Sequence, residues 1–248
     1  MTLQEFFAEN PRAAIAFSGG VDSSYLLYAA VQCGADVHAY FAKTAFQPQF
    51  ELDDAQRLAR DIHAPMTVLR ADVLRDETVT ANPANRCYYC KKVVFSSIAQ
   101  AALADGYTLL LDGTNASDDA GDRPGMRALQ ELQVLSPLRL CGLTKPEIRR
   151  LSKEARLFTW DKPAYACLAT RIPTGEKITA EKLSATESAE GELFAMGFTD
   201  FRVRWYAGAA RLQFPAVQLP RVLERREEIL TKLKKYYPAV LLDLEVRG

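Results

Sequence analysis

Short hydrophobic runs and longer amphipathic stretches alternate along the first two thirds of the chain. The short runs are typical of buried strands, and the stretches between them repeat their hydrophobic positions every three to four residues, as helices with one buried face do. Strands are predicted at 13–17, 37–41, 66–69 and 108–111, and helices at 23–32, 50–62 and 88–104. Strands that alternate with helices of this length form βαβ units. The pattern therefore predicts an α/β fold with a doubly wound parallel sheet covered on both faces.

Two further segments of this region carry local signals. A long polar connection at 70–86 separates the third predicted strand from the helix that follows it. A helix is predicted over 144–155, because Thr144 can cap its first turn while Glu147 closes a capping box.

The chain changes character after residue 157. The segment 158–177 is rich in proline and glycine, which is typical of a long functional loop or a linker. It is followed by a predicted helix at 180–196, a hairpin at 201–214 that turns at Gly208, a charged helix at 218–236 and a strand at 240–246. We therefore expect two domains: residues 1–172 with the parallel sheet, and a small α+β domain at 173–248 that serves substrate binding or oligomerisation.

The composition is that of an ordinary globular protein, with 48% hydrophobic and 25% charged residues. No run approaches about 18 apolar residues, and the first residues lack a basic start followed by an apolar stretch, so neither a membrane span nor a signal peptide is expected. Thirty-one basic residues balance thirty-one acidic ones, which gives no global attraction to nucleic acid. We expect a cytoplasmic protein that binds neither membrane nor nucleic acid.

One glycine-rich loop directly follows the first predicted strand and opens the first helix. It reads Ser18-Gly19-Gly20-Val21-Asp22-Ser23-Ser24. Its glycines allow a tight turn, its backbone N–H groups and the helix N-terminus favour an anion, and Asp22 can hold Mg²⁺ against phosphates. The spacing and the lysine of a Walker A loop are missing, and so is the G-x-G-x-x-G pattern of a dinucleotide loop. The loop therefore predicts a phosphate site of another kind.

The motif SGGVDSS resembles the PP-loop of the ATP pyrophosphatases, which bind ATP and cleave it to AMP and pyrophosphate. The resemblance implies that the protein activates a carbonyl oxygen as an adenylate, from which a nitrogen or sulfur nucleophile displaces AMP. It also implies an adenine nucleotide alpha hydrolase-like sheet, the same doubly wound architecture that the hydrophobic pattern predicts.

Three of the five cysteines stand in distinctive surroundings. Cys87 and Cys90 form a Cys-x-x-Cys pair in NRCYYCKK, and Cys167 lies in AYACLATRIPTG. Without a secretory signal, metal or catalytic roles are favoured over disulfides. A zinc site lacks an evident fourth ligand, since His38 and His63 stand away from the cysteines. A thioredoxin-like redox pair and a 4Fe–4S cluster held by three thiolates are also compatible with these cysteines.

Three segments further along the chain narrow the resemblance. They are DGTNASDDAGDRPGMRAL at 112–129, SPLRLCGLTKPEIRRLS at 136–152 and WDKPAYACLATRIPTGEKIT at 160–179, and in this order they are similar to motifs of the LarE family. LarE proteins are ATP-dependent sulfur transferases that make the nickel-pincer nucleotide cofactor of lactate racemase and related enzymes. They adenylate a carboxylate of pyridinium-3,5-biscarboxylic acid mononucleotide and convert it to a thiocarboxylate.

Two sulfur chemistries occur in that family, and this chain resembles the second. Some members sacrifice the sulfur of the single cysteine in the C-L-A-[ST]-R motif, whereas others combine this cysteine with a Cys-x-x-Cys and hold a 4Fe–4S cluster. The resemblance implies that Cys87, Cys90 and Cys167 hold such a cluster and that a sulfur donor is a partner. Thr170 stands where the family often has serine, and it keeps the hydroxyl.

The resemblance also assigns nucleotide-binding residues. The ATP phosphates and magnesium fall to Ser18, Gly19, Gly20, Asp22, Ser23 and Ser24, and the rest of the nucleotide to Gly113, Thr114 and Asn115. The last three follow the fourth strand, at the carboxyl edge where doubly wound sheets bind ligands. Asp118, Asp119 and Arg123 stand in the same loop, where helix capping is the alternative for each aspartate. The segment 43–50 is less similar, so contacts to the adenine there stay open.

A second anion site is expected around the small domain. The residues that would hold the phosphate of the mononucleotide are Thr170, Arg171, Arg202 and Arg204, with Glu190 tying the guanidinium groups in place. A planar guanidinium group can meet phosphate oxygens with two hydrogen bonds at once. Arg202 and Arg204 are two apart on a predicted strand, so they share one face. The alternative is a solvent-facing pair beside an apolar face.

These observations together predict a LarE-type, ATP-dependent sulfur transferase of nickel-pincer cofactor biosynthesis, acting on a pyridinium mononucleotide and forming a homo-oligomer. Its main rival is a PP-loop enzyme that thiolates tRNA, since some of those also use three cysteines and a 4Fe–4S cluster. The zero net charge and the lack of a recognisable RNA-binding appendage speak against this rival. A third hypothesis is a non-catalytic regulator that binds nucleotide and metal.

Overall fold

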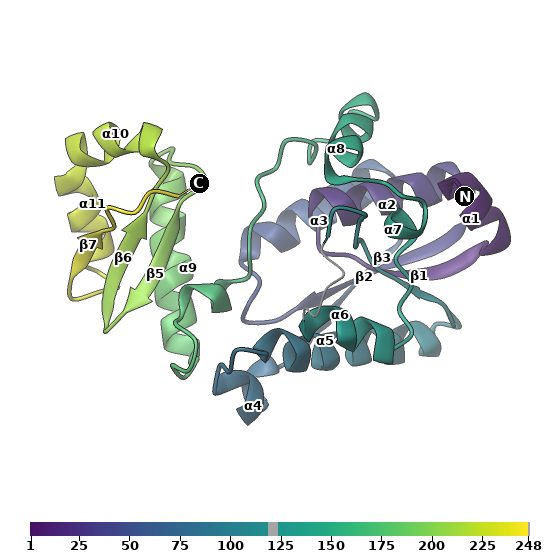
Figure 1. Ribbon diagram of the computed structural model, residues 1–248, viewed down its shortest axis with the longest axis horizontal. Helices are drawn as coiled ribbons and strands as arrows, with labels where there is room; N and C mark the ends of the chain where they lie inside the picture. The colour runs from purple at the N-terminus through teal and green to yellow at the C-terminus, as the bar shows by residue number, and fades with distance from the viewer. Residues whose placement is uncertain (119–123, 248) are drawn as a thin grey trace. The chain divides into compact units, whose positions relative to one another are not determined.

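The computed structural model describes residues 1–118 and 124–247, and it contains two compact units, most of whose helices and strands are labelled in Figure 1. The first unit comprises Met1–Val73 and Asn85–Ala164, and the second comprises Leu74–Ala84 and Tyr165–Gly248. Among the described residues, no helix has both the length and the apolar character needed to cross a membrane.

The second unit begins before the boundary that the sequence places after residue 172. The 3₁₀ helix Leu168–Arg171 packs against helix α9 (Ala180–Ala195), and Arg171 is paired with a carboxylate of that helix. The segment 74–84 joins the same unit because the side chain of Asn82 donates hydrogen bonds to the carbonyls of Ile172 and Pro173. Both attachments are made by long-range polar contacts, which composition alone does not reveal.

The first unit is built on a four-stranded parallel sheet. In chain order its strands are β1 Arg12–Ala16, β2 Asp36–Lys43, β3 Met66–Arg70 and β4 Leu110–Leu111. Their order across the sheet is β3-β2-β1-β4, so the chain moves outward to β3 and then returns to the other side of β1. A reversal of this kind is where doubly wound sheets bind ligands, beyond the carboxyl ends of the strands. The predicted α/β fold is confirmed.

Helices cover both faces of this sheet, as Figure 1 shows. Ala13 and Ile15 of β1 belong to a hydrophobic cluster on one face, and Ala14 between them belongs to a cluster on the other, as strand alternation requires. The first face is covered by α1 Leu3–Glu9, α2 Val21–Gln32, α3 Gln49–Asp61, α7 Pro137–Leu140 and α8 Lys145–Glu154. The second is covered by α5 Arg86–Ala104 and α6 Pro124–Glu131.

The second unit is a small α+β structure. Strands β5 (Arg202–Tyr206) and β6 (Ala209–Gln213) form an antiparallel hairpin, and β7 (Val240–Leu242) pairs with β6 in parallel. Ala207 and Gly208 join the hairpin with φ values of 47° and 85°, the two positive values that a type I′ turn needs. The predicted hairpin is therefore confirmed. The helices of this unit are α4 Glu77–Thr80, α9, α10 Leu219–Glu224 and α11 Arg226–Leu233.

Some predicted elements differ from the structure. The charged helix predicted at 218–236 is interrupted at Arg225, whose φ of −98° and ψ of 19° lie outside the helical region and whose guanidinium group bonds the carbonyl of Met196 at 2.7 Å. The strand predicted at 240–246 ends at Leu242. The hydrophobic pattern does not predict helices α1, α4, α6 and α7, because segments of four to eight residues carry too few turns to show a helical period.

Candidate functional site

The glycine-rich loop leaves the carboxyl end of β1 and leads into α2. Gly19 has a φ of 71°, which glycine adopts without strain. Gly20 is the N-cap of α2, and its carbonyl accepts a hydrogen bond from the Ser23 hydroxyl at 3.2 Å. That hydroxyl in turn accepts from the N–H of Ser18 at 3.3 Å. The loop is thereby folded back on the first turn of α2, whose N–H groups point out of the helix end and favour an anion.

A second loop, which follows β4, lies against the same helix start. A Cβ atom at residue 113 would lie 2.8 Å from the backbone nitrogen of Ser23 and 3.0 Å from its Cα, so only glycine permits this approach. Asp112, just before it, is buried and accepts hydrogen bonds from the N–H of Thr114 at 3.2 Å and from the Ser136 hydroxyl at 2.6 Å. These contacts fix Gly113 and Thr114 beside the glycine-rich loop.

The remainder of this second loop is held by side chains that bond nearby backbone. Asn115 is buried, its N–H donates to Asp118 at 2.9 Å, and its side-chain oxygen accepts from the N–H of Ser117 at 2.8 Å. Asp118 thus bonds the backbone of its own loop, and it also lines a cavity at this edge of the sheet. Asp119 and Arg123 lie outside the described residues.

A cavity of about 370 Å³ lies within the first unit, at the carboxyl ends of β1, β2 and β4. Its polar lining comes from the two loops, including Asp22 and Thr114, and also from Gln47 and from Cys90 and Lys91 of α5. Its apolar lining comes from the end of β2 and from α5, namely Phe41, Ala42, Val94, Phe95 and Ile98. The volume is typical of small-molecule sites, which hold about 300–1,000 Å³. A cavity that is polar at the phosphate-type loop and apolar beside it fits a nucleotide, with its phosphates and its base.

The segment 43–50 contributes to this cavity through Gln47. The side-chain oxygen of Gln47 accepts hydrogen bonds from the hydroxyl of Thr44 at 2.6 Å and from its N–H at 3.1 Å, so the residue is fixed in a tight turn after β2. The sequence alone leaves the role of this segment open, because its turn has no distinctive motif.

Asp22 is the carboxylate of the glycine-rich loop, and its side chain is 22% exposed. Its Oδ2 forms an ion pair with the Nζ of Lys145, whereas its Oδ1 is buried and has no hydrogen-bond partner among the described residues. Burial raises the pKa of Asp22 above its ordinary value of 3.8, and Lys145 opposes that effect. A buried carboxylate oxygen without a partner is unfavourable. Magnesium takes oxygen ligands of this kind, so Asp22 fits a magnesium ion.

Ser24 of the same loop, by contrast, points into the protein interior rather than into the cavity. It is fully buried, and its hydroxyl has no hydrogen-bond partner among the described residues. Its side chain does not line the cavity that Ser18, Gly20, Asp22 and Ser23 line. The loop therefore offers its phosphate-facing groups from the residues before Ser24.

Cys87 and Cys90 lie three residues apart at the start of α5, so they share one side of the helix. Cys87 is exposed, and Cys90 is half-buried and lines the same cavity as the glycine-rich loop. The Nη2 of Arg86 lies 3.8 Å from the Sγ of Cys87. A guanidinium group therefore stands beside the first thiol of the pair.

Cys167 belongs to the second unit, whereas the Cys-x-x-Cys pair belongs to the first. Within each unit, the described residues contain no group of three His, Cys, Asp or Glu side chains that could hold a metal ion. The pair offers two of the three thiolates that a 4Fe–4S cluster of the expected kind requires, and the cluster itself stays a prediction.

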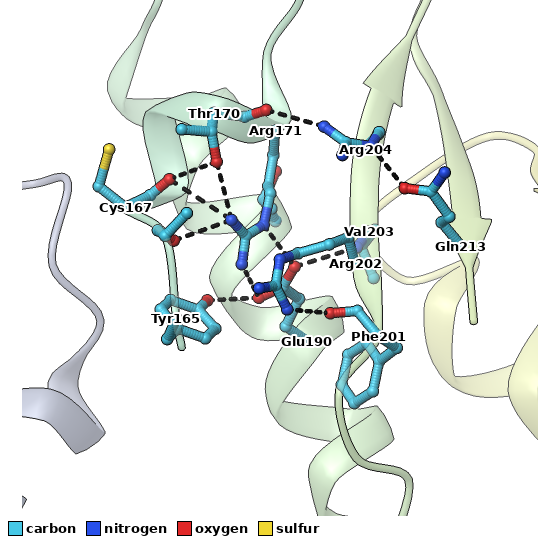
Figure 2. A network of polar contacts seen from close by, with 12 residues as sticks. Tyr165, Cys167, Thr170, Arg171, Glu190, Phe201, Arg202, Val203, Arg204 and Gln213 are labelled. Carbon is cyan, nitrogen blue, oxygen red and sulfur yellow. Dashed lines mark hydrogen bonds and ion pairs between the residues drawn. The ribbon is translucent and has the colours of Figure 1, made fainter. Parts of the chain in front are cut away.

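Arg171 and Glu190 form a buried ion pair in the second unit, with side chains only 0% and 2% exposed (Figure 2). Two hydrogen bonds join them, from Nε to Oε1 at 2.8 Å and from Nη2 to Oε2 at 3.2 Å. Glu190 also accepts from the N–H of Val203 at 3.0 Å and from the hydroxyl of Tyr165. Burial alone would lower the pKa of Arg171, but the pairing with Glu190 raises it overall.

The remaining donors of Arg171 hold the loop around Cys167. Its Nη1 donates to the carbonyl of Ala166 at 2.8 Å and to the hydroxyl of Thr170 at 2.9 Å. That hydroxyl donates to the carbonyl of Cys167 at 2.8 Å, as Figure 2 shows. Thr170, Arg171 and Glu190 thus form a frame for the backbone beside Cys167, with their polar groups engaged within the protein.

Arg202 and Arg204 extend from β5 beside this frame. Arg202 is only 5% exposed, and its Nη1 donates to the carbonyl of Phe201 at 2.6 Å. Burial, followed by the neighbouring Arg171, lowers the pKa of Arg202 to about 10. Arg204 donates to the carbonyl of Thr170 at 3.1 Å and to a side-chain oxygen on β6. A solvent-facing pair is therefore wrong for Arg202, which is buried among other cations.

The structure thus gathers the predicted residues into two groups, one in each unit. It also adds residues that sequence reasoning does not single out: Gln47 at the cavity, Tyr165 on Glu190, and Lys145 on Asp22. Only Lys145 carries a signal in the sequence, because a lysine directly after the N-cap of a helix lies at the positive end of the helix dipole.

No protein-family model matches the chain. An uncharacterised protein of Synechocystis is 39% identical over 249 residues, which cover 98% of this chain and 92% of that protein. A pyridinium-3,5-bisthiocarboxylic acid mononucleotide synthase of Lactiplantibacillus plantarum is 30% identical over 246 residues, 98% of this chain and 89% of that one. The tRNA-specific 2-thiouridylase MnmA of Fervidobacterium nodosum is 25% identical over 126 residues, 41% of this chain and 36% of that one.

Proposed function

The chain belongs to the LarE family, that of the pyridinium-3,5-bisthiocarboxylic acid mononucleotide synthases, and on that premise we propose that it is an ATP-dependent sulfur transferase. Its substrate is pyridinium-3,5-biscarboxylic acid mononucleotide, one carboxylate of which is adenylated and then converted to a thiocarboxylate. The product belongs to the biosynthesis of the nickel-pincer nucleotide.

One observation carries the proposal: a single cavity of the first unit is lined by the glycine-rich loop, by Asp22, by Thr114 and by Cys90. Groups suited to phosphates and magnesium therefore stand beside a thiol. The backbone N–H groups at the start of α2 and the metal on Asp22 would bind the triphosphate. Phe41 and the apolar face of α5 would receive the base.

The adenylation step follows from this arrangement. A carboxylate oxygen of the substrate bonds to the α-phosphorus of ATP, the bond from that phosphorus to the α,β-bridging oxygen breaks, and pyrophosphate leaves with the electron pair. A sulfide nucleophile then adds to the activated carbonyl carbon, and AMP leaves with the former carboxylate oxygen. Preorganised N–H donors stabilise the charge that develops on the phosphates.

We propose that Cys87, Cys90 and Cys167 hold a 4Fe–4S cluster. Bound by three thiolates, such a cluster has one iron without a protein ligand, which can carry the sulfide. The chain's own contribution is the thiolate pair at the start of α5 and the Arg171 frame that fixes the backbone at Cys167. A separate sulfur donor restores the sulfide after each turnover.

The phosphate of the mononucleotide would bind at Arg202 and Arg204. Because Arg171 and Glu190 bond each other, we assign them the role of holding the frame, with Thr170, rather than that of direct phosphate ligands. The low pKa of Arg202 reflects buried positive charge, which a phosphate dianion would relieve.

The test is an anaerobic assay of the purified protein with ATP, magnesium and either the mononucleotide or unmodified tRNA. We expect AMP and pyrophosphate to form only with the mononucleotide, together with a product in which sulfur replaces one carboxylate oxygen. Thiolated tRNA would instead favour the second candidate function, which rests on the similarity to the tRNA thiouridylase. Nucleotide binding without turnover on either substrate would favour a non-catalytic regulator.

A further inference from the structure

The turn that follows α8 is held against two helices of the first unit. Arg149 of α8 donates to the carbonyls of Trp160 at 2.7 Å and of Lys162 at 2.8 Å. The guanidinium group of Arg57 on α3 lies 4.2 Å from the centre of the Phe158 ring. The backbone of Lys162 is therefore anchored, and its side chain starts from a fixed position.

The side chain of Lys162 extends to the glycine-rich loop. Its Nζ pairs with the Oδ2 of Asp54 on α3 at 2.7 Å, and it donates to the carbonyl of Gly19 at 3.4 Å. The loop also lies directly on that helix, because a Cβ atom at residue 19 would be 3.1 Å from the Cβ of Ala55 and 3.1 Å from the carbonyl oxygen of Glu51. Gly19 therefore packs on α3 and is bonded by an ammonium group that the same helix holds.

Stability accounts for only part of this arrangement. The side chains of Lys162 and Asp54 are 15% and 32% exposed, and a part-exposed ion pair adds little to stability. Holding a long lysine side chain in one conformation also costs entropy. The ion pair with Asp54 does not explain the second bond of the ammonium group, which goes to the backbone of Gly19.

That second bond fixes the orientation of one peptide group. The carbonyl of Gly19 and the N–H of Gly20 belong to the same planar trans peptide, so they point in opposite directions. Because glycine stands on both sides, this peptide can rotate at little steric cost. With the carbonyl on Lys162, the N–H of Gly20 lies 3.4 Å from the Oγ of Ser18, and Ser18 and Gly20 both line the cavity. The bond thus selects the orientation in which this N–H faces the cavity.

We propose that Lys162 is a positioning residue of the nucleotide site: without touching the nucleotide, it holds the carbonyl of Gly19 so that the N–H of Gly20 faces the phosphates of ATP. The inference rests on the ATP binding proposed above. A donor that is oriented in advance binds an anion more strongly than one that must first turn toward it. Removal of the ammonium group should therefore weaken ATP binding although it removes no contact to the nucleotide.

The first test compares wild-type protein with Lys162→Met, which keeps the length of the side chain and removes its charge. Calorimetry measures the affinity for magnesium-ATP, which we expect to fall by about 10-fold. Lys162→Arg keeps a cationic donor and should recover most of the affinity. The matched control is Lys153→Met, because the Nζ of Lys153 lies 4.5 Å from the ring centre of Trp160 in the same turn. This control should bind magnesium-ATP normally.

The second test observes the peptide itself, because Gly19-Gly20 is the one Gly-Gly pair in the sequence. Glycine labelled with ¹³C at the carbonyl and with ¹⁵N is supplied together with unlabelled serine. A spectrum that selects a ¹³C carbonyl bonded to a ¹⁵N amide then contains the signal of Gly20 alone. We expect one sharp signal in wild type and in Lys162→Arg, but a broadened or divided signal in Lys162→Met, whose peptide can take both orientations.

Several results would overturn the inference. Equal affinity of wild type and Lys162→Met for magnesium-ATP is one, and a single unchanged Gly20 signal in that variant is another. An equal loss of affinity in Lys153→Met would show that the turn only supports the fold. If Lys162→Met does not fold, wild-type protein still decides, because magnesium-ATP should shift the Gly20 signal and an unchanged signal contradicts the proposal. Wild-type protein that binds no magnesium-ATP at all would instead contradict the proposed function.

Discussion

The two groups of candidate residues prepare for anions in opposite ways. The glycine-rich loop of the first unit offers backbone N–H groups, and it holds a carboxylate with one buried oxygen that has no partner among the described residues. The arginine group of the second unit is built on the Arg171–Glu190 pair, whose oxygens and nitrogens are engaged within the protein. An unsatisfied oxygen of a carboxylate that lines a cavity can be completed by a ligand, whereas satisfied groups hold their surroundings in place.

This difference separates residues of function from residues of stability. Burial raises the pKa of Asp22, so its negative charge is unfavourable at the place where the fold holds it. Glu190 is held by two hydrogen bonds from Arg171 and one from the backbone of β5, so its removal should damage the unit itself. Substitutions at the two sites should therefore give different patterns of activity and stability.

The largest effect is expected from the three cysteines, which the proposed cluster takes from both units. Replacing Cys87, Cys90 or Cys167 by alanine should abolish the cluster and sulfur transfer. The reason is that all three thiolates are needed to hold the cluster, whose fourth iron then has no protein ligand. Iron and sulfide analysis of anaerobically purified protein measures the first effect, and thiocarboxylate formation the second. ATP binding should persist. The cluster would be contradicted if wild-type protein turned over once and lost the sulfur of Cys167 while the Cys87→Ala and Cys90→Ala variants stayed active.

The next largest effect is expected at Asp22. Asp22→Ala should lower the rate of adenylation by orders of magnitude, because the metal ion that this carboxylate holds carries charge in the transition state. The release of pyrophosphate measures the rate. The thermal unfolding temperature should stay near that of wild type, since Oδ1 of Asp22 has no partner among the described residues and the ion pair of Oδ2 with Lys145 is part-exposed and adds little to stability. Release of AMP at a near wild-type rate would end the assignment of Asp22 to the metal.

Glu190→Gln should show the opposite pattern, with a loss of stability as its first consequence. It leaves Arg171 buried without a carboxylate, and breaking a buried pair in this way costs about 3–5 kcal/mol. Unfolding in urea measures the change. Glu192→Gln on the same helix is the matched control, because its partner Lys232 is part-exposed, and its loss should be far smaller. Equal losses in the two variants would show that the frame is not the source of stability.

A smaller effect, on binding, is expected at the two arginines of β5. Arg202→Ala and Arg204→Ala should each weaken binding of the mononucleotide by roughly 1.5–3 kcal/mol if the bonds to phosphate are charge-assisted. Calorimetry with the mononucleotide and with magnesium-ATP measures both affinities. ATP binding should scarcely change, because the glycine-rich loop belongs to the other unit. Equal losses for both ligands would make the arginines structural.

The sequence predicts the first unit better than the second, for a physical reason. Hydrophobic runs and glycines act locally, so the parallel sheet and the conformation of the glycine-rich loop are readable from residues that are neighbours in the chain. The break at Arg225 and the attachment of Asn82 depend on hydrogen bonds to residues far away in sequence. The same limit hides Lys145, whose partner Asp22 is 123 positions away.

The smallest effect concerns pH, and it compares the two carboxylates directly. Because burial raises the pKa of Asp22 in the folded protein, the folded state binds more protons than the unfolded chain between the ordinary value of 3.8 and the raised one. Stability contributed by this group is therefore lost as the pH rises through that window. Asp22→Asn removes the titration, so its free energy of unfolding should improve relative to wild type as the pH rises, in contrast to the loss expected for Glu190→Gln. Urea unfolding of wild type and of Asp22→Asn at a series of pH values, without nucleotide or magnesium, measures the difference. Curves that stay parallel at every pH would mean that Asp22 carries no such conflict between charge and burial, and that the contrast between the two sites is one of position alone.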